Sequence, residues 1–249
     1  MPRKLSKNRN SLPLDPPTSS SSKSPSLAYL PTWVHDSLPL PRLVVIDLDY
    51  TLWPFYTDIN VNTPIKLVSS SNHTTVTDRN GELFTLFPDV PYILNLLSHL
   101  GIRLAVASKS PVGDLCRDIL RLLRLPTTTA PGKKTSEESA SNSNDSPGKK
   151  TPKGGSTPGS SSGGGTGRKV IEAFDGGLEI YEGTKLHHFD AIEKRTGIPY
   201  TEMLFFDDEW PNIEVETLGV TMKLVGNRGL CWAELDEGIQ KWRANRGVK

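Results

Sequence analysis

Continuous apolar runs alternate along most of the chain with segments in which apolar residues recur at helical spacing. Residues 43–48 form the first run, which is rich in Leu, Val and Ile and typical of a strand that is covered on both faces. The apolar runs predict strands at residues 43–48, 103–108, 178–181, 203–206 and 221–225. Helical spacing predicts helices at residues 88–100, 111–123, 186–196, 212–218 and 233–243. This alternation predicts an α/β fold with a mostly parallel sheet and helices on both faces.

Proline, serine and glycine residues predict where several helices begin and end. Pro88 is expected in the first turn of one helix, and the pair Ser110 and Pro111 is expected to cap and begin the next. Gly101 and Gly197 follow the last apolar positions of two helices and are expected to end them.

The pattern becomes polar between Trp53 and Phe87. Short alternating stretches occur around residues 74–76 and 83–85, and the pair Asn80 and Gly81 between them is typical of a tight turn. We therefore expect a small β flap here, and no large cap domain.

Two segments have compositions that do not favour folding. Residues 1–28 and about 126–168 are rich in Ser, Gly, Pro, Thr and Lys and poor in large apolar side chains. Such segments cannot bury enough surface to offset the entropy lost on ordering. We expect a disordered tail at 1–28 and a single domain at 29–249, interrupted by a disordered insertion.

Charge and cysteine content restrict the classes of function. Lys and Arg number 29 and Asp and Glu 28, so the net charge is +1, and nothing indicates a nucleic-acid surface. No apolar run reaches the ~18 to 20 residues that cross a bilayer. Cys116 and Cys231 fit neither a disulfide framework nor a zinc site, so we expect buried thiols in a reducing compartment. The prediction is a monomer in the cytoplasm or nucleus, without a membrane partner.

Polar residues follow the apolar runs at several strand ends. They are Asp47, Asp49 and Thr51 after the first strand, Ser108 and Lys109 after the second, Asp207 and Asp208 after the fourth, and Lys185 at the start of a helix. In open parallel sheets, ligands bind beyond the carboxyl ends of the strands, so we expect these side chains to meet.

Their chemistry indicates a site for a metal ion and a phosphate group. Asp47 and Asp49 are separated by one residue, and their carboxylates repel each other unless a cation is present. A third carboxylate from Asp207 or Asp208 completes a hard oxygen site suited to Mg²⁺. The serine and lysine residues would provide hydrogen-bond donors and positive charge for phosphate oxygens.

A carboxylate in such a site can attack phosphorus. Asp47 would form an aspartyl phosphate, which divides one displacement into two. Asp49 would donate a proton to the departing oxygen and later activate water. Its pKa is expected above the ordinary aspartate value, because the neighbouring carboxylate disfavours a second charge.

The motifs resemble those of the haloacid dehalogenase (HAD) superfamily, and specifically its magnesium-dependent phosphatase-1 family. The resemblance rests on residues 47–55, 107–109, 181–185, 196–199 and 205–209 with Asn212, and it covers about residues 41–125 and 174–242. It implies a Rossmann-like, HAD-type fold and a magnesium-dependent phosphatase.

The resemblance also implies a role for each site residue. It makes Asp47 the nucleophile and a metal ligand, Asp49 the acid/base and a metal ligand through its backbone carbonyl, and Asp208 a metal ligand. The residues that it implies for binding the substrate phosphate are Ser108, Lys109, Lys185 and Thr51, with Asp207 and Asn212 in support. The family usually has arginine where this chain has Lys109, which puts a bidentate grip on phosphate in doubt.

Several alternatives for the substrate stay open. The resemblance points to phosphotyrosine, general acid-phosphatase or sugar-phosphate substrates, whether small molecules or phosphoproteins. One alternative is a phosphoserine protein phosphatase of the kind that acts on a disordered polymerase tail, and another is a non-catalytic binding protein on the same fold. Trp53, Phe55 and Tyr56 would either form an apolar wall for the substrate or pack within the flap.

Overall fold

The computed structural model describes residues 30–71, 73–126 and 167–248. The chain divides into two units, one ending at Ser37 and the other beginning at Leu38. In the first unit the described residues include one short 3₁₀ helix, η1 (Thr32–Val34). The predicted tail at 1–28 and nearly all of the predicted insertion at 126–168 lie outside the described residues.

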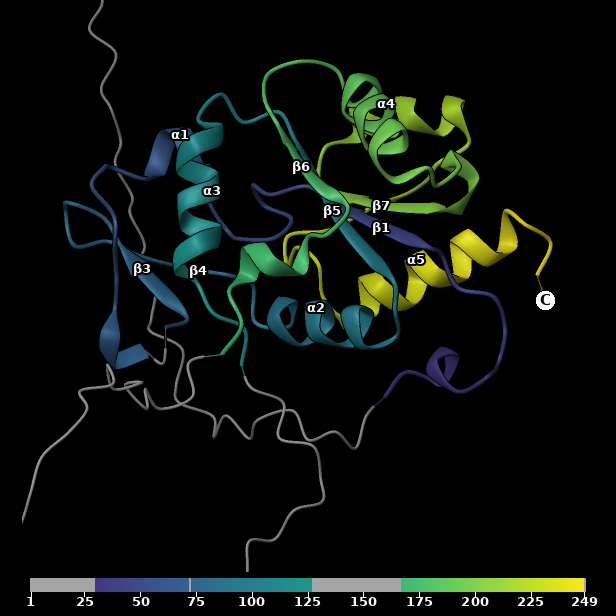
Figure 1. Cartoon of the computed structure of the whole chain (residues 1–249), viewed down its shortest axis with the longest axis horizontal. Helices are drawn as coiled ribbons and strands as arrows, with labels where there is room; N and C mark the ends of the chain where they lie inside the picture. Colours follow the sequence, from purple (N-terminus) through teal and green to yellow (C-terminus); the bar gives the residue numbers. More distant parts are fainter. Residues whose placement is uncertain (1–29, 72, 127–166, 249) are drawn as a thin grey trace, which may run out of the picture. The chain divides into compact units, whose positions relative to one another are not determined.

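A five-stranded parallel sheet forms the centre of the second unit (Figure 1). The strands are β1 (Leu43–Ile46), β5 (Arg103–Ser108), β6 (Gly177–Ile180), β7 (Met203–Asp207) and β8 (Thr221–Leu224), in the order β6-β5-β1-β7-β8. Strand β1 lies in the middle, and its Leu43 pairs with Arg103 on one side and with Met203 on the other. The predicted parallel sheet is confirmed.

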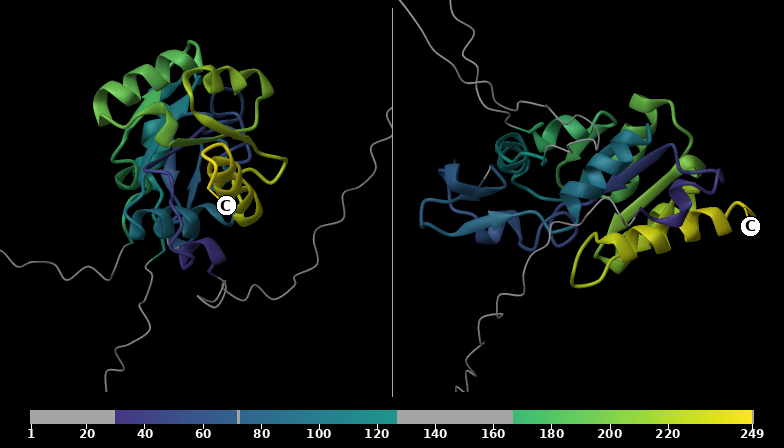
Figure 2. Two further views of the ribbon diagram at one scale, coloured as in Figure 1. Left: turned by 90° about the vertical axis from the view of Figure 1, so that its right-hand side faces the viewer. Right: turned by 90° about the horizontal axis from the view of Figure 1, so that it is seen from below.

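Helices cover both faces of this sheet, as the apolar runs predict. The 3₁₀ segment η5 (Trp210–Leu218) and α4 (Lys185–Thr196) lie on one face, and α2 (Val90–His99) and α5 (Trp232–Ala244) lie on the other (Figures 1 and 2). All four residues of β1 are buried, because successive side chains point to opposite faces and each face is covered.

Close packing fixes the distance between the helices and the sheet. On the α4 face, Val45 and Phe205 pack with Phe189 and Ile192 in one buried cluster. On the other face α5 approaches β7 at Gly238, where a Cβ atom would lie 2.6 Å from the ring of Phe206. Glycine is therefore required at this contact.

The predicted flap is a separate antiparallel sheet, in the order β2-β3-β4. Its strands are β2 (Lys66–Leu67), β3 (Thr75–Thr77) and β4 (Leu83–Thr85), and the short helix α1 (Thr57–Asn60) precedes them. The turn at Gly81, whose φ is +87°, confirms the expected hairpin. The sequence pattern missed β2, which is two residues long. Within the described residues no larger cap is present.

Three helix predictions need correction. The helix α2 begins at Val90 with Asp89 as its N-cap, so Pro88 precedes the helix and the proline of its first turn is Pro91. The helix α3 (Gly113–Leu122) begins at Gly113, with Val112 as its N-cap, so Ser110 and Pro111 neither cap nor begin it. The Ser110 hydroxyl accepts from the Cys116 thiol over 3.4 Å instead of from a backbone N–H of the first turn, and the Ser110 N–H donates to the Ser108 hydroxyl, 3.3 Å away. Residues 210–218 form a 3₁₀ helix rather than the expected α-helix.

The residues that flank segment 127–166 pair with each other. Arg124 forms an antiparallel bridge with Lys169, and the Leu125 N–H donates to the Arg168 carbonyl over 2.8 Å. The described residues on the two sides of this segment are therefore neighbours in space.

Both cysteines, Cys116 and Cys231, are buried and free, which confirms the prediction of buried thiols. Among the helices of the described ranges, none has the length and apolar character needed to cross a membrane.

One carboxylate holds the flap turn together, which leads to a stability prediction. Asp78 accepts hydrogen bonds from the backbone N–H groups of Asn62 (3.1 Å), Asn80 (2.8 Å) and Glu82 (3.0 Å). We expect Asp78→Asn to lower the melting temperature and to speed hydrogen exchange across residues 62–82, because one acceptor oxygen becomes a donor. Asp114→Asn, at an exposed position, is the control; equal effects of the two substitutions would contradict the prediction.

The same turn gives a pH dependence. Burial alone would raise the pKa of Asp78, but the backbone donors outweigh it and hold the pKa below its ordinary value. A lowered folded-state pKa adds stability that is complete above the ordinary aspartate value of about 4 and is lost as the pH falls through the lowered value. Melting temperatures of the Asp78→Asn variant should lack this acid-dependent component.

Candidate active site

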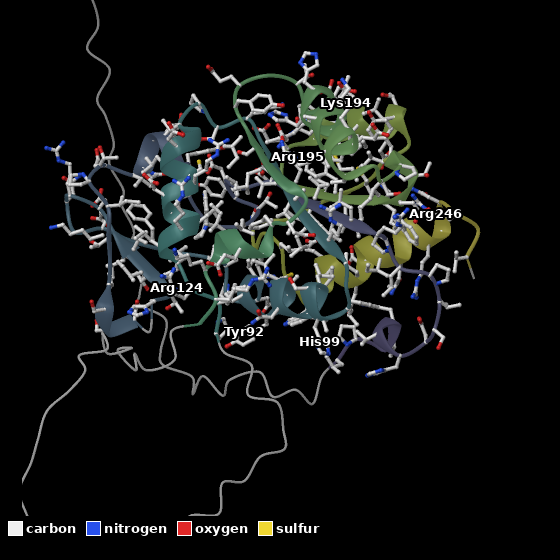
Figure 3. The ribbon with its side chains drawn as sticks, viewed as in Figure 1. Tyr92, His99, Arg124, Lys194, Arg195 and Arg246 are labelled. Atoms are coloured by element: carbon white, nitrogen blue, oxygen red, sulfur yellow. The ribbon has the colours of Figure 1, made fainter. Side chains whose placement is uncertain are left out.

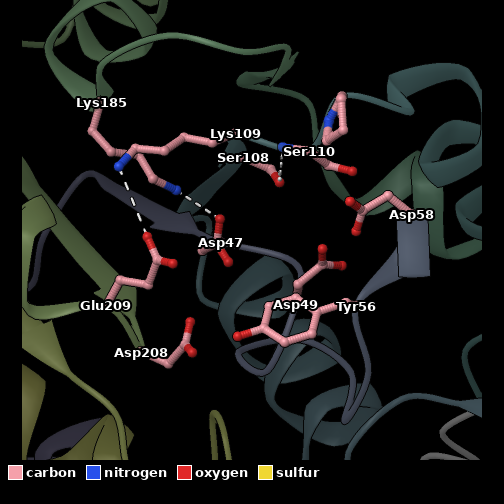
Figure 4. Close-up of a pocket in the computed structure, with 11 residues that line it drawn as sticks. Asp47, Asp49, Tyr56, Asp58, Ser108, Lys109, Ser110, Lys185, Asp208 and Glu209 are labelled. Carbon is pink, nitrogen blue, oxygen red and sulfur yellow. Dashed lines mark hydrogen bonds and ion pairs between the residues drawn. The ribbon is translucent and has the colours of Figure 1, made fainter. Parts of the chain in front are cut away.

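A cavity of about 170 Å³ opens where the carboxyl ends of β1, β5 and β7 meet α1 and the start of α4. Its lining residues are Asp47, Asp49, Tyr56, Asp58, Ser108, Lys109, Ser110, Pro111, Lys185, Asp208 and Glu209. Figure 4 shows side chains from these separate segments pointing toward one shared space. The strand ends therefore bring together most of the predicted site residues.

Lys185 is the most buried charged side chain of the cavity, with 1% of its surface exposed. It begins α4, and its Nζ lies 2.6 Å from Asp47 Oδ1 and 3.0 Å from Asp207 Oδ2. The third donor direction meets the carbonyl oxygen of Ala107 at 2.6 Å. An ammonium group has three N–H donors, and here three oxygens surround it.

These contacts shift the pKa of both partners. Burial raises the pKa of Asp47 well above its ordinary value, although the Lys185 ammonium opposes this shift. Burial would lower the pKa of Lys185, but the carboxylates of Asp47 and Asp207 outweigh it, so this pKa is raised. The lysine therefore stays charged at neutral pH and provides a fixed positive charge.

The Asp49 side chain is held in place by the flap side of the site. Its Oδ1 accepts hydrogen bonds from Trp53 Nε1 and Thr57 Oγ1, both at 2.7 Å, and from the Thr57 N–H at 3.3 Å. The pKa of Asp49 is raised, as expected, but the main cause is burial and not the neighbouring carboxylate. A carboxyl group that keeps its proton longer is suited to act as an acid.

The two aspartates after β7 lie in different surroundings. Asp207 is fully buried and accepts from Asn212 Nδ2 at 2.8 Å and from the Glu209 N–H at 2.7 Å, besides contacting Lys185. Asp208 lines the cavity. Burial, followed by the charge of Asp207, raises the pKa of Asp208 to about 6. Of this pair, only Asp208 can reach a ligand in the cavity.

Strand β5 and the residues after it form another wall of the cavity. Ser108 is buried and its Oγ accepts from the Ser110 N–H, while Lys109 extends into the cavity and its Nζ lies 3.8 Å from Glu209 Oε2. The dashed line between Lys109 and Glu209 in Figure 4 marks this pair. Both cavity lysines thus contact carboxylates.

One residue that is predicted to bind the substrate phosphate does not reach the cavity. Thr51 is fully buried and does not line the cavity; instead its Oγ1 donates to Asp208 Oδ1 over 3.4 Å. The structure therefore gives Thr51 a contact with Asp208, and its contact with substrate stays a prediction.

The sequence prediction also missed some lining residues. Ser110, Pro111 and Glu209 directly follow predicted site residues, so their adjacency was the available signal. Asp58 lies on α1, and no periodicity in the flap segment marks that one-turn helix.

The aromatic residues after the first motif have different roles. Trp53 and Phe55 are buried and stack at 5.3 Å, and Phe55 also meets Phe84, so both belong to the packing of the flap. Tyr56 is 41% exposed and lines the cavity, where its ring lies 4.7 Å from that of Tyr50. Of the three proposed wall residues, only Tyr56 lines this cavity.

The donor set fits a hard divalent cation in part. Asp47 and Asp208 provide carboxylate oxygens at one cavity, and such oxygens suit Mg²⁺. Within the described residues, however, no three His, Cys, Asp or Glu side chains are close enough to hold a metal by themselves. Asp49 Oδ1 is occupied by Trp53 and Thr57, so a third protein ligand would be another oxygen, such as Asp49 Oδ2 or a backbone carbonyl, with water or phosphate completing the shell.

Comparison with known proteins found a matching family and several similar chains. The acid phosphatase family matches residues 39–245. Human magnesium-dependent phosphatase 1 is 33% identical, over 81% of this chain and 86% of that protein. A HAD-like hydrolase superfamily protein of Schizosaccharomyces pombe is 30% identical, over 74% of this chain and 86% of its own. A solved HAD-superfamily hydrolase from Ehrlichia chaffeensis is 13% identical, over 85% of this chain and 99% of that chain, with a TM-score of 0.45.

The parallel sheet and the acidic cluster at its strand ends are those of a phosphatase of the HAD-like class. Within that class, the chain belongs to the acid phosphatase family. The resemblance to magnesium-dependent phosphatase 1 that the motifs predict is thus confirmed.

Two lysines of one helix allow a test of how much the buried ion pairs matter. Lys185→Met leaves Asp47 and Asp207 buried without their cation, so we expect a loss of about 3–5 kcal/mol in the free energy of unfolding. Lys194 lies on the outer side of α4 (Figure 3) and pairs with Asp190 while 71% exposed, so Lys194→Met should cost less than about 0.5 kcal/mol. Urea denaturation at pH 7 without Mg²⁺ measures both, and similar losses would contradict the prediction.

Proposed function

We propose that this phosphatase hydrolyses phosphate monoesters with Mg²⁺ through an aspartyl phosphate on Asp47. The observation that carries the proposal is the contact of Asp47 with the buried Lys185 at 2.6 Å, in a cavity that Asp49 and Asp208 also line. A nucleophile, a proton donor and positive charge for the phosphate therefore meet at one place.

In the first step, Asp47 is the nucleophile. Its Oδ1 is held by Lys185, which leaves Oδ2 to attack phosphorus in line with the departing alcohol oxygen. The bond between phosphorus and the alcohol oxygen breaks, and that oxygen takes a proton from the Asp49 carboxyl. The raised pKa of Asp49 supports this role, because the group must be protonated when the substrate arrives.

In the second step, Asp49 acts as a base. Its carboxylate accepts a proton from water while the water oxygen bonds to phosphorus and the bond between phosphorus and Asp47 breaks. Inorganic phosphate leaves, and Asp49 is again protonated. Hydrogen bonds from Trp53 and Thr57 to Oδ1 keep the side chain in one orientation through both steps.

The metal ion would be held by the carboxylates of Asp47 and Asp208 and by the backbone carbonyl of Asp49. When bound, Mg²⁺ supplies positive charge that offsets the charge of the phosphate oxygens and of the surrounding carboxylates. Ser108 and Lys109 contribute donors for the phosphate oxygens, and Lys185, whose three donors meet protein oxygens, contributes positive charge. The name of the human relative supports the choice of magnesium.

The substrate class is proposed from the walls of the cavity. Tyr56 presents an exposed ring beside the catalytic groups, and no large cap covers the cavity in the described parts of the chain. An aryl phosphate such as phosphotyrosine can stack on this ring, which favours the phosphotyrosine and acid-phosphatase substrates over an aliphatic phosphoserine. The two buried free cysteines support a cytoplasmic location.

Asp47→Asn tests the proposed nucleophile. We expect the rate of p-nitrophenyl phosphate hydrolysis to fall by at least about a thousandfold, because an amide does not replace the carboxylate in attack. Chelation with EDTA should abolish the wild-type activity, and added Mg²⁺ should restore it. Asp118→Asn, an exposed residue of α3, is the control. Retained hydrolysis in the Asp47 variant would refute the proposed role.

Tyr56→Ala tests the proposed substrate class. We expect the wild type to have a higher kcat/KM for a phosphotyrosine peptide than for the matching phosphoserine peptide or a hexose phosphate, by about tenfold, and Tyr56→Ala to reduce that preference. Ile59→Ala, at a 70% exposed position of the same short helix that does not line the cavity, is the control. Equal or faster hydrolysis of the phosphoserine peptide would instead favour the polymerase-tail type of phosphatase.

A further inference from the structure

Glu209 has a position that the proposed chemistry does not explain. Its side chain lines the cavity in which a phosphate dianion is to be bound, and it is about half exposed. A carboxylate at this place repels the substrate. The contacts of Glu209 with neighbouring residues point to a different role for this carboxylate.

Two buried residues fix Glu209 in place. Its backbone N–H donates to Asp207 Oδ1 over 2.7 Å, and its Oε2 accepts from Asn212 Nδ2 at 3.3 Å. The same Asn212 amide donates to Asp207 Oδ2 at 2.8 Å, and Asn212 is only 1% exposed. The Glu209 carboxylate is therefore oriented by the fold before any ligand binds.

Lys109 is the residue that this oriented carboxylate meets. Its Nζ lies 3.8 Å from Glu209 Oε2, and this is its one ion pair within the described residues. A half-exposed pair of this length adds little to stability. A lysine side chain has four rotatable bonds, however, so a fixed carboxylate restricts where its ammonium lies.

The two lysines of the cavity are therefore connected by one line of polar contacts. It runs from Lys185 through Asp207, Asn212 and Glu209 to Lys109. Lys185 is surrounded by three protein oxygens, whereas Lys109 has one such contact and two N–H donors left for a ligand.

We propose that Glu209, fixed by Asp207 and Asn212, is a positioning residue that holds the Lys109 ammonium over the cavity for the substrate phosphate. The inference rests on the proposed function, because it takes Lys109 as a phosphate ligand. It explains how a lysine can work where an arginine is usual: a guanidinium is rigid and forked, whereas an ammonium on a flexible stem needs a fixed partner to orient it. In this proposal, the phosphate binding gained by positioning the Lys109 ammonium outweighs the repulsion between Glu209 and phosphate.

A double-mutant cycle tests the proposal with Glu209→Gln, Lys109→Met and the combination. The measurements are KM and kcat for p-nitrophenyl phosphate with Mg²⁺, and the Kd of inorganic phosphate by calorimetry. We expect Glu209→Gln to raise KM and Kd about threefold to fivefold, with a much smaller change in kcat. In the Lys109→Met background the same change should leave Kd unaltered or lower it, because only the repulsion is then removed.

Glu209→Asp separates position from charge. It keeps the negative charge but is one methylene shorter, so we expect it to weaken phosphate binding as Glu209→Gln does. Lys109→Arg should keep both phosphate binding and its coupling to Glu209, since the longer guanidinium reaches both groups. Glu214→Gln, which removes one negative charge from η5, the 3₁₀ segment that follows Glu209, at a position outside the cavity lining, is the matched control and should change neither constant.

The outcomes are distinct. If Glu209→Gln tightens phosphate binding equally with and without Lys109, or if Glu209→Asp leaves binding unchanged, Glu209 is only a repelling charge and the inference is wrong. Those results presuppose a wild type that hydrolyses p-nitrophenyl phosphate. A wild type without chelator-sensitive hydrolysis would overturn the proposed function itself, whatever the cycle shows.

Discussion

The ion pairs of Lys185 with Asp47 and Asp207 join the strand ends of the sheet to the start of α4 within the active site. The lysine begins α4, Asp47 directly follows β1, and Asp207 is the last residue of β7. The contact therefore requires that the two strands and the helix keep their register. Strand β1 pairs with β7 from Leu43 with Met203 onward, and a slip by one residue would send Asp47 to the other face. The apolar packing on both faces fixes this register, and the buried charges depend on it.

Much of the site follows from the sequence because parallel strands end at one edge of the sheet. That rule, with the apolar runs before Asp47, Ser108 and Asp207, predicts which residues meet. It does not predict the contacts that these residues make with other parts of the chain. Thr51 lies beneath Asp208 instead of facing the cavity, and the pKa of Asp49 is raised mainly by burial, which depends on how the flap packs. Such contacts between distant segments leave no periodic signal.

Asp207 and Asp208 show how adjacent residues at a strand end can divide two tasks. Successive side chains of an extended chain point to opposite sides. Asp207 is the last residue of β7 and turns into the protein, where Lys185, Asn212 and the Glu209 N–H contact it, and Asp208 turns into the cavity. The sequence left this choice open because the spacing alone does not tell which side holds the lysine.

The limited cover over the cavity is consistent with hydrolysis in two steps. In the proposed mechanism water must reach the phosphorylated Asp47 after the alcohol has left. A cavity bordered by α1 and by the residues that follow β5 and β7 allows this, since the described residues include no large cap that would have to open. The same openness places Lys109 partly in solvent, where a flexible cation would lose much of its effect. The Glu209 carboxylate offsets this loss, because it orients Lys109 and is itself held by the buried residues Asp207 and Asn212. The contacts that fix Lys185 thus also extend to the exposed wall of the site.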